Sequence, residues 1–224
     1  MNLLIVNPTG NRSLNDKIYD RAIYSAKITA RNSEDHTNIS VINIADAAGE
    51  LATADSLASL PDLILKALQP IAHAYDGIII AHSSDAGVNF LKDALKKTVI
   101  GISYSAIYTA FPLGKRMGMF VDKTQTAIMQ KLVDDYKKSI LADVKLLPVD
   151  ISSGNEETIL ENMRQTIEKM TDINRLDSII IDDINMSFAM KPLFDLYKLP
   201  VIDAVMSAVS VTENIIFNKK WLEA

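Results

Sequence analysis

The chain has no cysteine among its 224 residues. This absence excludes disulfides, thiolate nucleophiles and sulfur ligands for metals, whatever fold the chain adopts. Positive charge is also scarce, because 23 Lys and Arg residues face 28 Asp and Glu residues, and no basic run is present. With a net charge of −5, the chain is expected to bind neither nucleic acid nor an anionic membrane surface.

Long apolar runs are missing as well. None approaches the roughly 20 residues that span a bilayer, and the opening LLIV is too short for the core of a signal peptide. We therefore expect a cytoplasmic protein with no membrane partner. A chain of this length can bury a core as one large domain or as two smaller lobes.

An internal repeat favours two lobes. DGIIIAHSSDAG (76–87) and DSIIIDDINMSF (177–188) each place an acidic residue before three isoleucines and a polar group after the apolar run. Aligned on their first residues, the two copies put His82 opposite Asp183. Three more pairs of segments match in the same order along the chain: 3–7 with 118–122, 40–46 with 144–150, and 96–106 with 198–208. A repeat of this kind indicates two halves of similar structure.

Apolar runs of strand length alternate with helical patterns along the whole chain. Strands without a polar face, joined by helices, are typical of parallel sheets covered on both sides. The sequence therefore predicts an α/β fold of two pseudo-symmetric lobes, each a parallel sheet flanked by helices, with the active site in the inter-lobe cleft. We expect residues 1–98 and 204–224 to form the N-terminal lobe with the closing helix, and residues 99–203 to form the C-terminal lobe.

Two helix starts carry capping signals. Asp85 precedes AGVNFLKDAL and is expected to cap the helix that begins near residue 86. Ser153 and Glu156 have the spacing of a capping box at the start of another helix. A further helix is expected over about 186–197.

Ligands of such sheets bind beyond the carboxyl ends of the strands, where loops and helix N-termini converge. His82 and Asp183 follow equivalent strands, so two facing lobes would bring both side chains to one cleft. A proton donor and a proton acceptor there can move a proton at carbon next to a carbonyl group. Serine hydroxyls and amide N–H groups at nearby helix starts would hold the enolate-like oxygen that develops.

The ordinary pKa values of the two side chains bear on the reaction. With roughly 6.5 for histidine and 3.9 for aspartate, moving the proton from imidazolium to carboxylate costs about 3.5 kcal/mol. A strict racemase needs both protonation states, one for each direction. The unperturbed values therefore favour a reaction with chemically different sides, unless burial shifts one of the pKa values.

Three other patterns are weaker. Ser83 and His82 are neighbours on a strand and point apart, which argues against a hydrolytic triad with Asp183. His82 with the adjacent Asp182 and Asp183 makes a poor metal site. The loop at 7–13 lacks the Gly-Lys-Ser/Thr ending of a phosphate-binding loop. We expect no metal and no other cofactor.

In their order, these segments resemble the aspartate/glutamate/hydantoin racemase superfamily over nearly the whole chain. LLIVNPTGNRS (3–13) resembles that family's opening strand and Asn-Pro-Asn-Thr loop, with Thr9 in place of the second Asn. GKRMGMFV (114–121) resembles its central Gly-x-Arg strand. Its two catalytic segments and its closing helix are resembled by the stretches at 76–87, 177–188 and 199–209.

The resemblance implies a cofactor-independent mechanism with one catalytic cysteine at the end of each catalytic segment. Those positions are His82 and Asp183 here, so a two-thiol racemisation does not apply. The resemblance further implies a homo-oligomer and a small carboxylate, amide or cyclic ureide as ligand. Each candidate also has a local alternative, such as Asp183 acting only as a helix N-cap. The expected substrate-binding residues are Asn7, Thr9, Gly10, Ser83, Ser84, Tyr104, Ser105, Thr124 and Asn185.

The sequence thus supports a cofactor-independent isomerase of racemase, epimerase or tautomerase type, with His82 and Asp183 as the acid–base pair. Which of the two is the base stays open at this point. Two alternatives remain. One is a lyase, such as a decarboxylase, or a hydrolase acting in the same cleft, and the other is a non-catalytic protein that binds a small ligand.

Overall fold

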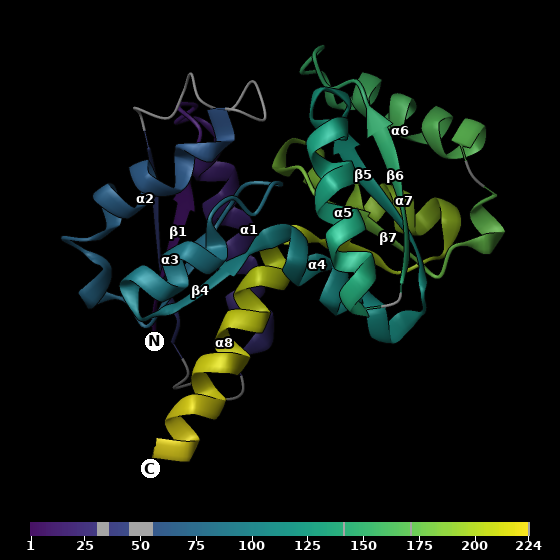
Figure 1. The fold of residues 1–224 in the computed structure, drawn as a ribbon. Coiled ribbons are helices and arrows are strands. Elements are labelled where there is room, and N and C mark those ends of the chain that lie inside the picture. Colours follow the sequence, from purple (N-terminus) through teal and green to yellow (C-terminus); the bar gives the residue numbers. More distant parts are fainter. Residues whose placement is uncertain (31–35, 45–55, 141, 171, 224) are drawn as a thin grey trace. The chain divides into compact units, whose positions relative to one another are not determined.

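The computed structural model describes residues 1–30, 36–44, 56–140, 142–170 and 172–223 (Figure 1). The chain divides into two compact units, the first of Met1–Ser105 with Val205–Ala224 and the second of Ala106–Ala204. Each unit holds a four-stranded parallel sheet, with strand order β2-β1-β3-β4 in the first and β6-β5-β7-β8 in the second. The predicted α/β architecture of two equivalent sheets is confirmed.

Strands and helices alternate in both units. The strands are β1 (Asn2–Asn7), β2 (Asn38–Asn43), β3 (Gly77–Ile80), β4 (Thr98–Gly101), β5 (Arg116–Asp122), β6 (Asp143–Val149), β7 (Ser178–Ile181) and β8 (Val201–Asp203). The α-helices are α1 (Leu14–Thr29), α2 (Leu60–Leu68), α3 (Val88–Leu95), α4 (Ile102–Ala110), α5 (Thr126–Ile140), α6 (Glu156–Met170), α7 (Met190–Tyr197) and α8 (Ala204–Glu223). Short 3-10 segments are η2 (Ser56–Ala58), η3 (Ala72–Ala74), η4 (Phe111–Leu113), η5 (Lys123–Gln125), η6 (Ile173–Arg175) and η7 (Ile184–Ala189).

Helices cover both faces of the first sheet, which explains its continuous apolar strands. Buried aliphatic residues of β1 and β3 pack against α2 and α3. On the other face, a Cβ added to Gly77 of β3 would lie 2.7 Å from Thr212 and 2.8 Å from Ile216. Helix α8, yellow in Figure 1, therefore lies directly on this sheet. In the second unit, Phe120 of β5 and residues of β6 and β7 pack against α6, η7 and α7.

The acidic residue before each isoleucine run joins two strands. The carboxylate of Asp76 accepts the backbone N–H of Asn2 at 2.7 Å, and that of Asp177 accepts the N–H of Arg116 at 3.0 Å. In return, Asp76 and Asp177 donate their own N–H groups to the carbonyls of Asn2 and Arg116. These bonds make Asn2 the counterpart of Arg116, so β1 and β5 correspond one residue away from the sequence match of 3–7 with 118–122.

The boundary between the units falls within α4. Strand β4 pairs with β3, from Gly77↔Thr98 to Ile80↔Gly101, and so belongs to the first sheet. Residues 99–105, which the sequence analysis placed in the C-terminal lobe, lie in the first unit. Helix α4 itself was not predicted, because its apolar residues do not gather on one face.

Both capping predictions are wrong. Asp85 does not cap α3, where Gly87 occupies the N-cap position. Positive φ angles of 48° at Asp85 and 74° at Gly87 turn the loop. The Asp85 carboxylate instead accepts backbone N–H groups at the start of α4. Helix α6 begins after Asn155, whose Oδ1 accepts the N–H of Thr158 at 2.9 Å, so the predicted box with Ser153 does not form.

The predicted helix at 186–197 is divided. Its first part belongs to the 3-10 segment η7, and only the second part is the α-helix α7. None of the helices in the described ranges combines the length and the apolar character that crossing a membrane requires.

Candidate active site

The candidate residues lie in loops and helix starts that follow parallel strands. In the first unit, β1, β3 and β4 lie side by side in one parallel sheet, so their carboxyl ends share one edge. In the second unit, β5 and β7 are likewise adjacent. The first edge carries Asn7, Thr9, Gly10, His82, Ser83, Ser84, Tyr104 and Ser105, and the second carries Thr124, Asp183 and Asn185.

The imidazole of His82, just after β3, folds back on its own loop. The backbone N–H of Ser84 donates to Nδ1 of His82 at 3.1 Å, and the Ser84 hydroxyl lies 2.7 Å from the same nitrogen. Burial lowers the pKa of the half-buried His82 to about 4, because a charged ring would lose hydration there. His82 is therefore a neutral imidazole at pH 7.

Asp183 makes a corresponding turn after β7. Its Oδ1 accepts the N–H of Asn185 at 2.8 Å, and Asp183 is the N-cap of η7. The same tripeptide, Asp-Ile-Asn, forms the same turn at the start of η6, where Asp172 accepts the N–H of Asn174 at 3.1 Å. The local capping role of Asp183 is thus realised. An ionised carboxylate has about four acceptor sites, so capping is compatible with a second role.

Asp85 ties the loop that carries His82 to α4. Its two carboxylate oxygens accept the N–H groups of Ser103 at 3.1 Å and Tyr104 at 2.7 Å. The Ser103 hydroxyl donates to the carbonyl of Ser83 at 2.7 Å. A carboxylate at a helix N-terminus is stabilised by the helix dipole as well as by these bonds. The His82 loop is therefore fixed against the start of α4.

Asn7 braces the loop after β1. Its amide NH₂ donates to the carbonyl of Asn11 at 3.0 Å and to Oδ1 of Asn15 at 2.9 Å. Its Oδ1 accepts the N–H of Thr9 at 3.0 Å and the Thr9 hydroxyl at 2.7 Å. These four bonds use the full capacity of a buried amide. Asn7 therefore shapes the loop that carries Thr9 and Gly10.

The other candidates differ in what their side chains do. Ser105 is fully buried and donates its hydroxyl to the carbonyl of Gly101 at 2.7 Å, so it supports the start of α4. Tyr104 and Thr124 are exposed. The N–H of Thr124 is held by Oδ1 of Asp122 at 3.0 Å, in a turn like that of Asn185.

A buried carboxylate that was not predicted from the sequence lies at the end of β8. Asp203 is 2% exposed, and the Ser187 hydroxyl donates to its Oδ2 at 2.5 Å. The pairs Ile80↔Gly101 and Ile181↔Asp203 make Asp203 the counterpart of Gly101. Asp203 directly follows an apolar strand, so the rule that singled out His82 and Asp183 would have found it if applied to the last strand.

The edge of the first unit presents a neutral imidazole and hydroxyls, and the edge of the second unit presents carboxylates. Within the described ranges, no group of three or more His, Asp or Glu side chains is arranged to hold a metal ion. Each unit thus carries, at the carboxyl ends of its strands, side chains of types that perform acid–base chemistry on small molecules.

Comparison with known proteins agrees with this class. The family model for Asp/Glu/Hydantoin racemase matches residues 3–212, and the chain belongs to this family. Membership places it among the racemase-type isomerases.

Individual relatives cover nearly the whole chain. A hydantoin racemase from Rhizobium meliloti is 24% identical over 224 residues, which cover 96% of this chain and 89% of that protein. The solved structure of an allantoin racemase from Pseudomonas fluorescens matches with a TM-score of 0.78 at 18% identity, covering 98% of this chain and 92% of the other. An allantoin racemase from Klebsiella pneumoniae matches with a TM-score of 0.73 at 17% identity, covering 98% of this chain and 89% of the other. At these identities the structural matches establish the fold.

Proposed function

We propose that the chain catalyses cofactor-independent proton transfer at carbon next to a carbonyl group of a small cyclic ureide, amide or carboxylate. In this proposal His82 and Asp183 are the acid–base pair. The observation that carries it is their placement, because they follow the equivalent strands β3 and β7. At both positions the family resemblance implies a catalytic residue, and each side chain is anchored by the backbone N–H of the second residue after it.

The charge state of His82 supports a wider range of reactions than the sequence suggested. Burial lowers the pKa of His82 to about 4, which is close to the ordinary value of roughly 3.9 for an aspartate. The mismatch that disfavoured a symmetrical racemisation came from the ordinary histidine value, which burial lowers. The ordinary histidine value therefore no longer argues against racemisation by this pair.

Cyclic ureides are the substrate class to test first. The relatives named above are a hydantoin racemase and two allantoin racemases, and hydantoin and allantoin are both cyclic ureides. In the proposal, Thr9, Gly10 and Ser83 contact the substrate in the first unit, with Tyr104 closing over it. Thr124 and Asn185 do so in the second unit, while Asn7 and Ser105 support the loops.

The experiment that tests this function measures hydrogen exchange at carbon. The protein is incubated in heavy water with single enantiomers of hydantoins, allantoin, aspartate and glutamate, and separately with unsaturated acids. Deuterium uptake is followed by NMR, and optical rotation is followed for the chiral compounds. We expect uptake and loss of optical activity with at least one cyclic ureide, without a change in product mass beyond the deuterium. Loss of carbon dioxide or gain of water would replace the proposal by a lyase or a hydrolase. Tight binding without exchange would replace it by a ligand-binding role.

A further inference from the structure

The hydrogen bonds around His82 fix which ring nitrogen carries the proton. A backbone N–H can only donate, so the N–H of Ser84, 3.1 Å from Nδ1, requires a lone pair on that nitrogen. With Nδ1 occupied as an acceptor, the proton of the neutral ring is on Nε2. An imidazolium would place a second N–H against the N–H of Ser84 and break this bond.

The charged groups of the same edge do not favour an imidazolium. In the described loops that follow the strands of the first sheet, the charged residues are Arg12, which is exposed, and Asp85. The Asp85 carboxylate faces the start of α4 and accepts two backbone N–H groups there. Burial acts in the same direction, because it lowers the pKa of His82 to about 4.

From this geometry we infer that His82 acts as a neutral imidazole whose Nε2–H donates to the substrate oxygen that becomes negative, and that Ser84 is the positioning residue that holds this tautomer. The inference rests on the proposed function and narrows it, because His82 keeps its proton and stabilises charge as a hydrogen-bond donor, and only Asp183 exchanges a proton with carbon. Asp183 is then the base.

The step balances without another reactant. The carboxylate of Asp183 takes the proton from carbon, and the electron pair of the broken C–H bond forms the enolate. The carbonyl oxygen gains the negative charge and is stabilised by the hydrogen bond from Nε2–H, which stays on His82. The planar enolate then takes a proton either from the Asp183 carboxyl group, which restores the starting enantiomer, or from a solvent water on its other face, which gives the opposite enantiomer. In the second case Asp183 releases the proton that it took to solvent. A neutral imidazole has a precedent in principle as such an electrophile, since triosephosphate isomerase uses one beside a carboxylate base.

The first test is spectroscopic and does not depend on activity. The chain has three histidines, and the other two, His36 and His73, are exposed and serve as references in a protein labelled with 15N-histidine. The His82→Gln variant identifies the signals of His82. At pH 7 we expect Nδ1 of His82 to show the shift of an unprotonated ring nitrogen and Nε2 that of a protonated one. A proton on Nδ1, or a cationic ring, at pH 7 overturns the inference.

The second test separates donation of a hydrogen bond from transfer of a proton. The amide of His82→Gln still offers an N–H donor, whereas His82→Ala offers none. Removing a donor to a developing oxyanion costs about 100- to 1000-fold in rate, so we expect His82→Ala to lose that much. His82→Gln should retain at least about 10-fold more exchange than His82→Ala, by the same comparison. Equal loss in both variants, with an active wild type, overturns the inference.

Ser84→Ala tests the positioning role. It removes the hydroxyl beside Nδ1 and keeps the backbone N–H, so the unprotonated nitrogen loses one of its two donors. We expect the pKa of His82 in the NMR titration to rise. The loss of activity in acid should therefore begin at a higher pH in Ser84→Ala than in the wild type. An unchanged titration would overturn the role of Ser84. If the wild type exchanges no hydrogen with any substrate, the proposed function fails and the catalytic part of the inference falls with it, whatever the tautomer.

Discussion

The carboxylate of Asp85 occupies the space that a side chain at Gly101 would need. A Cβ added to Gly101 would lie 2.2 Å from both Cγ and Oδ1 of Asp85. The bare backbone at the end of β4 thus lets Asp85 reach α4. In the second unit the counterpart of Gly101 is Asp203, which supplies its own buried carboxylate and binds Ser187. Each unit thus has a buried carboxylate at the end of an equivalent strand. In the first unit it comes from the loop after β3 and requires a glycine at the end of β4. In the second unit the residue at the end of β8 supplies it.

Gly101→Ala is therefore expected to destabilise the first unit through Asp85. The new methyl group pushes the carboxylate off the N–H groups of Ser103 and Tyr104, which adds overpacking to the loss of a helix cap. Together these cost about 1–3 kcal/mol of the free energy of unfolding. Urea denaturation at pH 7 measures the loss.

A double-mutant cycle supplies the control for Gly101. In an Asp85→Ala background the collision is absent, so Gly101→Ala should cost much less, with a coupling energy of about 1–2 kcal/mol between the two sites. Additive effects would mean that Asp85 and Gly101 do not depend on each other as the structure indicates.

Asp183→Asn separates the capping role of this residue from its proposed role as base. Asparagine keeps an acceptor oxygen for the N–H of Asn185, so stability should change by less than about 0.5 kcal/mol. The exchange rate should fall at least about 100-fold, because the amide does not accept the proton from carbon.

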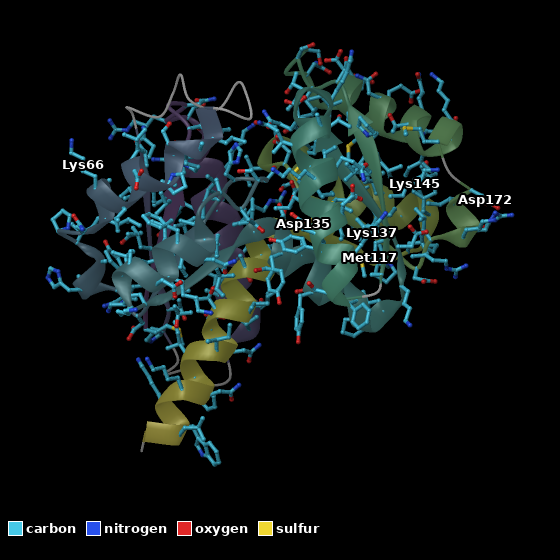
Figure 2. All side chains as sticks on the ribbon, viewed as in Figure 1. Lys66, Met117, Asp135, Lys137, Lys145 and Asp172 are labelled. Carbon is cyan, nitrogen blue, oxygen red and sulfur yellow. The ribbon has the colours of Figure 1, made fainter. Side chains whose placement is uncertain are left out.

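The chain contains its own matched control for that substitution. Asp172 begins the same Asp-Ile-Asn turn at the surface of the second unit, where Figure 2 labels it. Asp172→Asn makes the same chemical change in the same local structure and should leave exchange unaltered. If Asp172→Asn and Asp183→Asn exchange hydrogen equally well, Asp183 is a cap and nothing more.

Folding stability should depend on pH through His82. Its pKa is about 4 in the folded chain and roughly 6.5 when unfolded, so the unfolded state binds the proton more readily between these values. The His82 ring therefore does not destabilise the fold above about pH 6.5, destabilises it increasingly as the pH drops, and adds no further loss below about pH 4. At about 1.36 kcal/mol per unit, the loss is about 1–3 kcal/mol for this half-buried ring.

The His82→Gln variant isolates this contribution from that of the carboxylates. Denaturant unfolding of both proteins from pH 7.5 to pH 4 gives the free energy of unfolding as a function of pH. As the pH falls, this free energy should decrease more in the wild type than in His82→Gln. Curves that run parallel over the whole range would show that His82 does not change its pKa on folding.

Asp177 should contribute to stability in acid. The guanidinium of Arg116, 2.6 Å away, and the backbone N–H of Arg116 lower the pKa of Asp177 to about 2. The sign is that of a depressed carboxylate: its contribution is present above the unfolded value of roughly 3.9 and is lost as the pH falls towards 2. Thermal unfolding between pH 5 and pH 2 should show a steeper decline in the wild type than in Asp177→Asn. Arg116→Gln should make the decline smaller and end it at a higher pH, and an unchanged decline would contradict the pairing.

Much of the fold could be predicted because it depends on short-range patterns. The isoleucine runs of β3 and β7 indicate strands buried on both faces, and the acidic residues before them mark equivalent starts. Helix α4 escaped prediction because its apolar residues surround the helix instead of forming one face. The register between β1 and β5 also escaped, since one-residue shifts in short apolar runs leave the sequence match almost unchanged.

The positions of the candidate site were predictable, but the partners of its side chains were not. Parallel topology sends His82 and Asp183 to strand ends, whatever their local bonds. Asp85 looked like a cap for the helix after it, yet its partners at Ser103 and Tyr104 belong to a strand–helix junction that pairing of β3 with β4 brings close. The residues next to Asp85 in the sequence therefore do not indicate which distant backbone N–H groups its carboxylate will bind.

The sequence by itself determined the alternation of strands and helices, the repeat that makes two equivalent units, and the exclusion of thiol chemistry. These follow from residue types and their spacing, which folding does not change. Only the tertiary structure decided that Asn7 braces a loop, that Gly101 makes room for Asp85, and that His82 is neutral with Nδ1 as an acceptor. Those properties depend on burial and on hydrogen-bond donors, which exist only once the chain has folded.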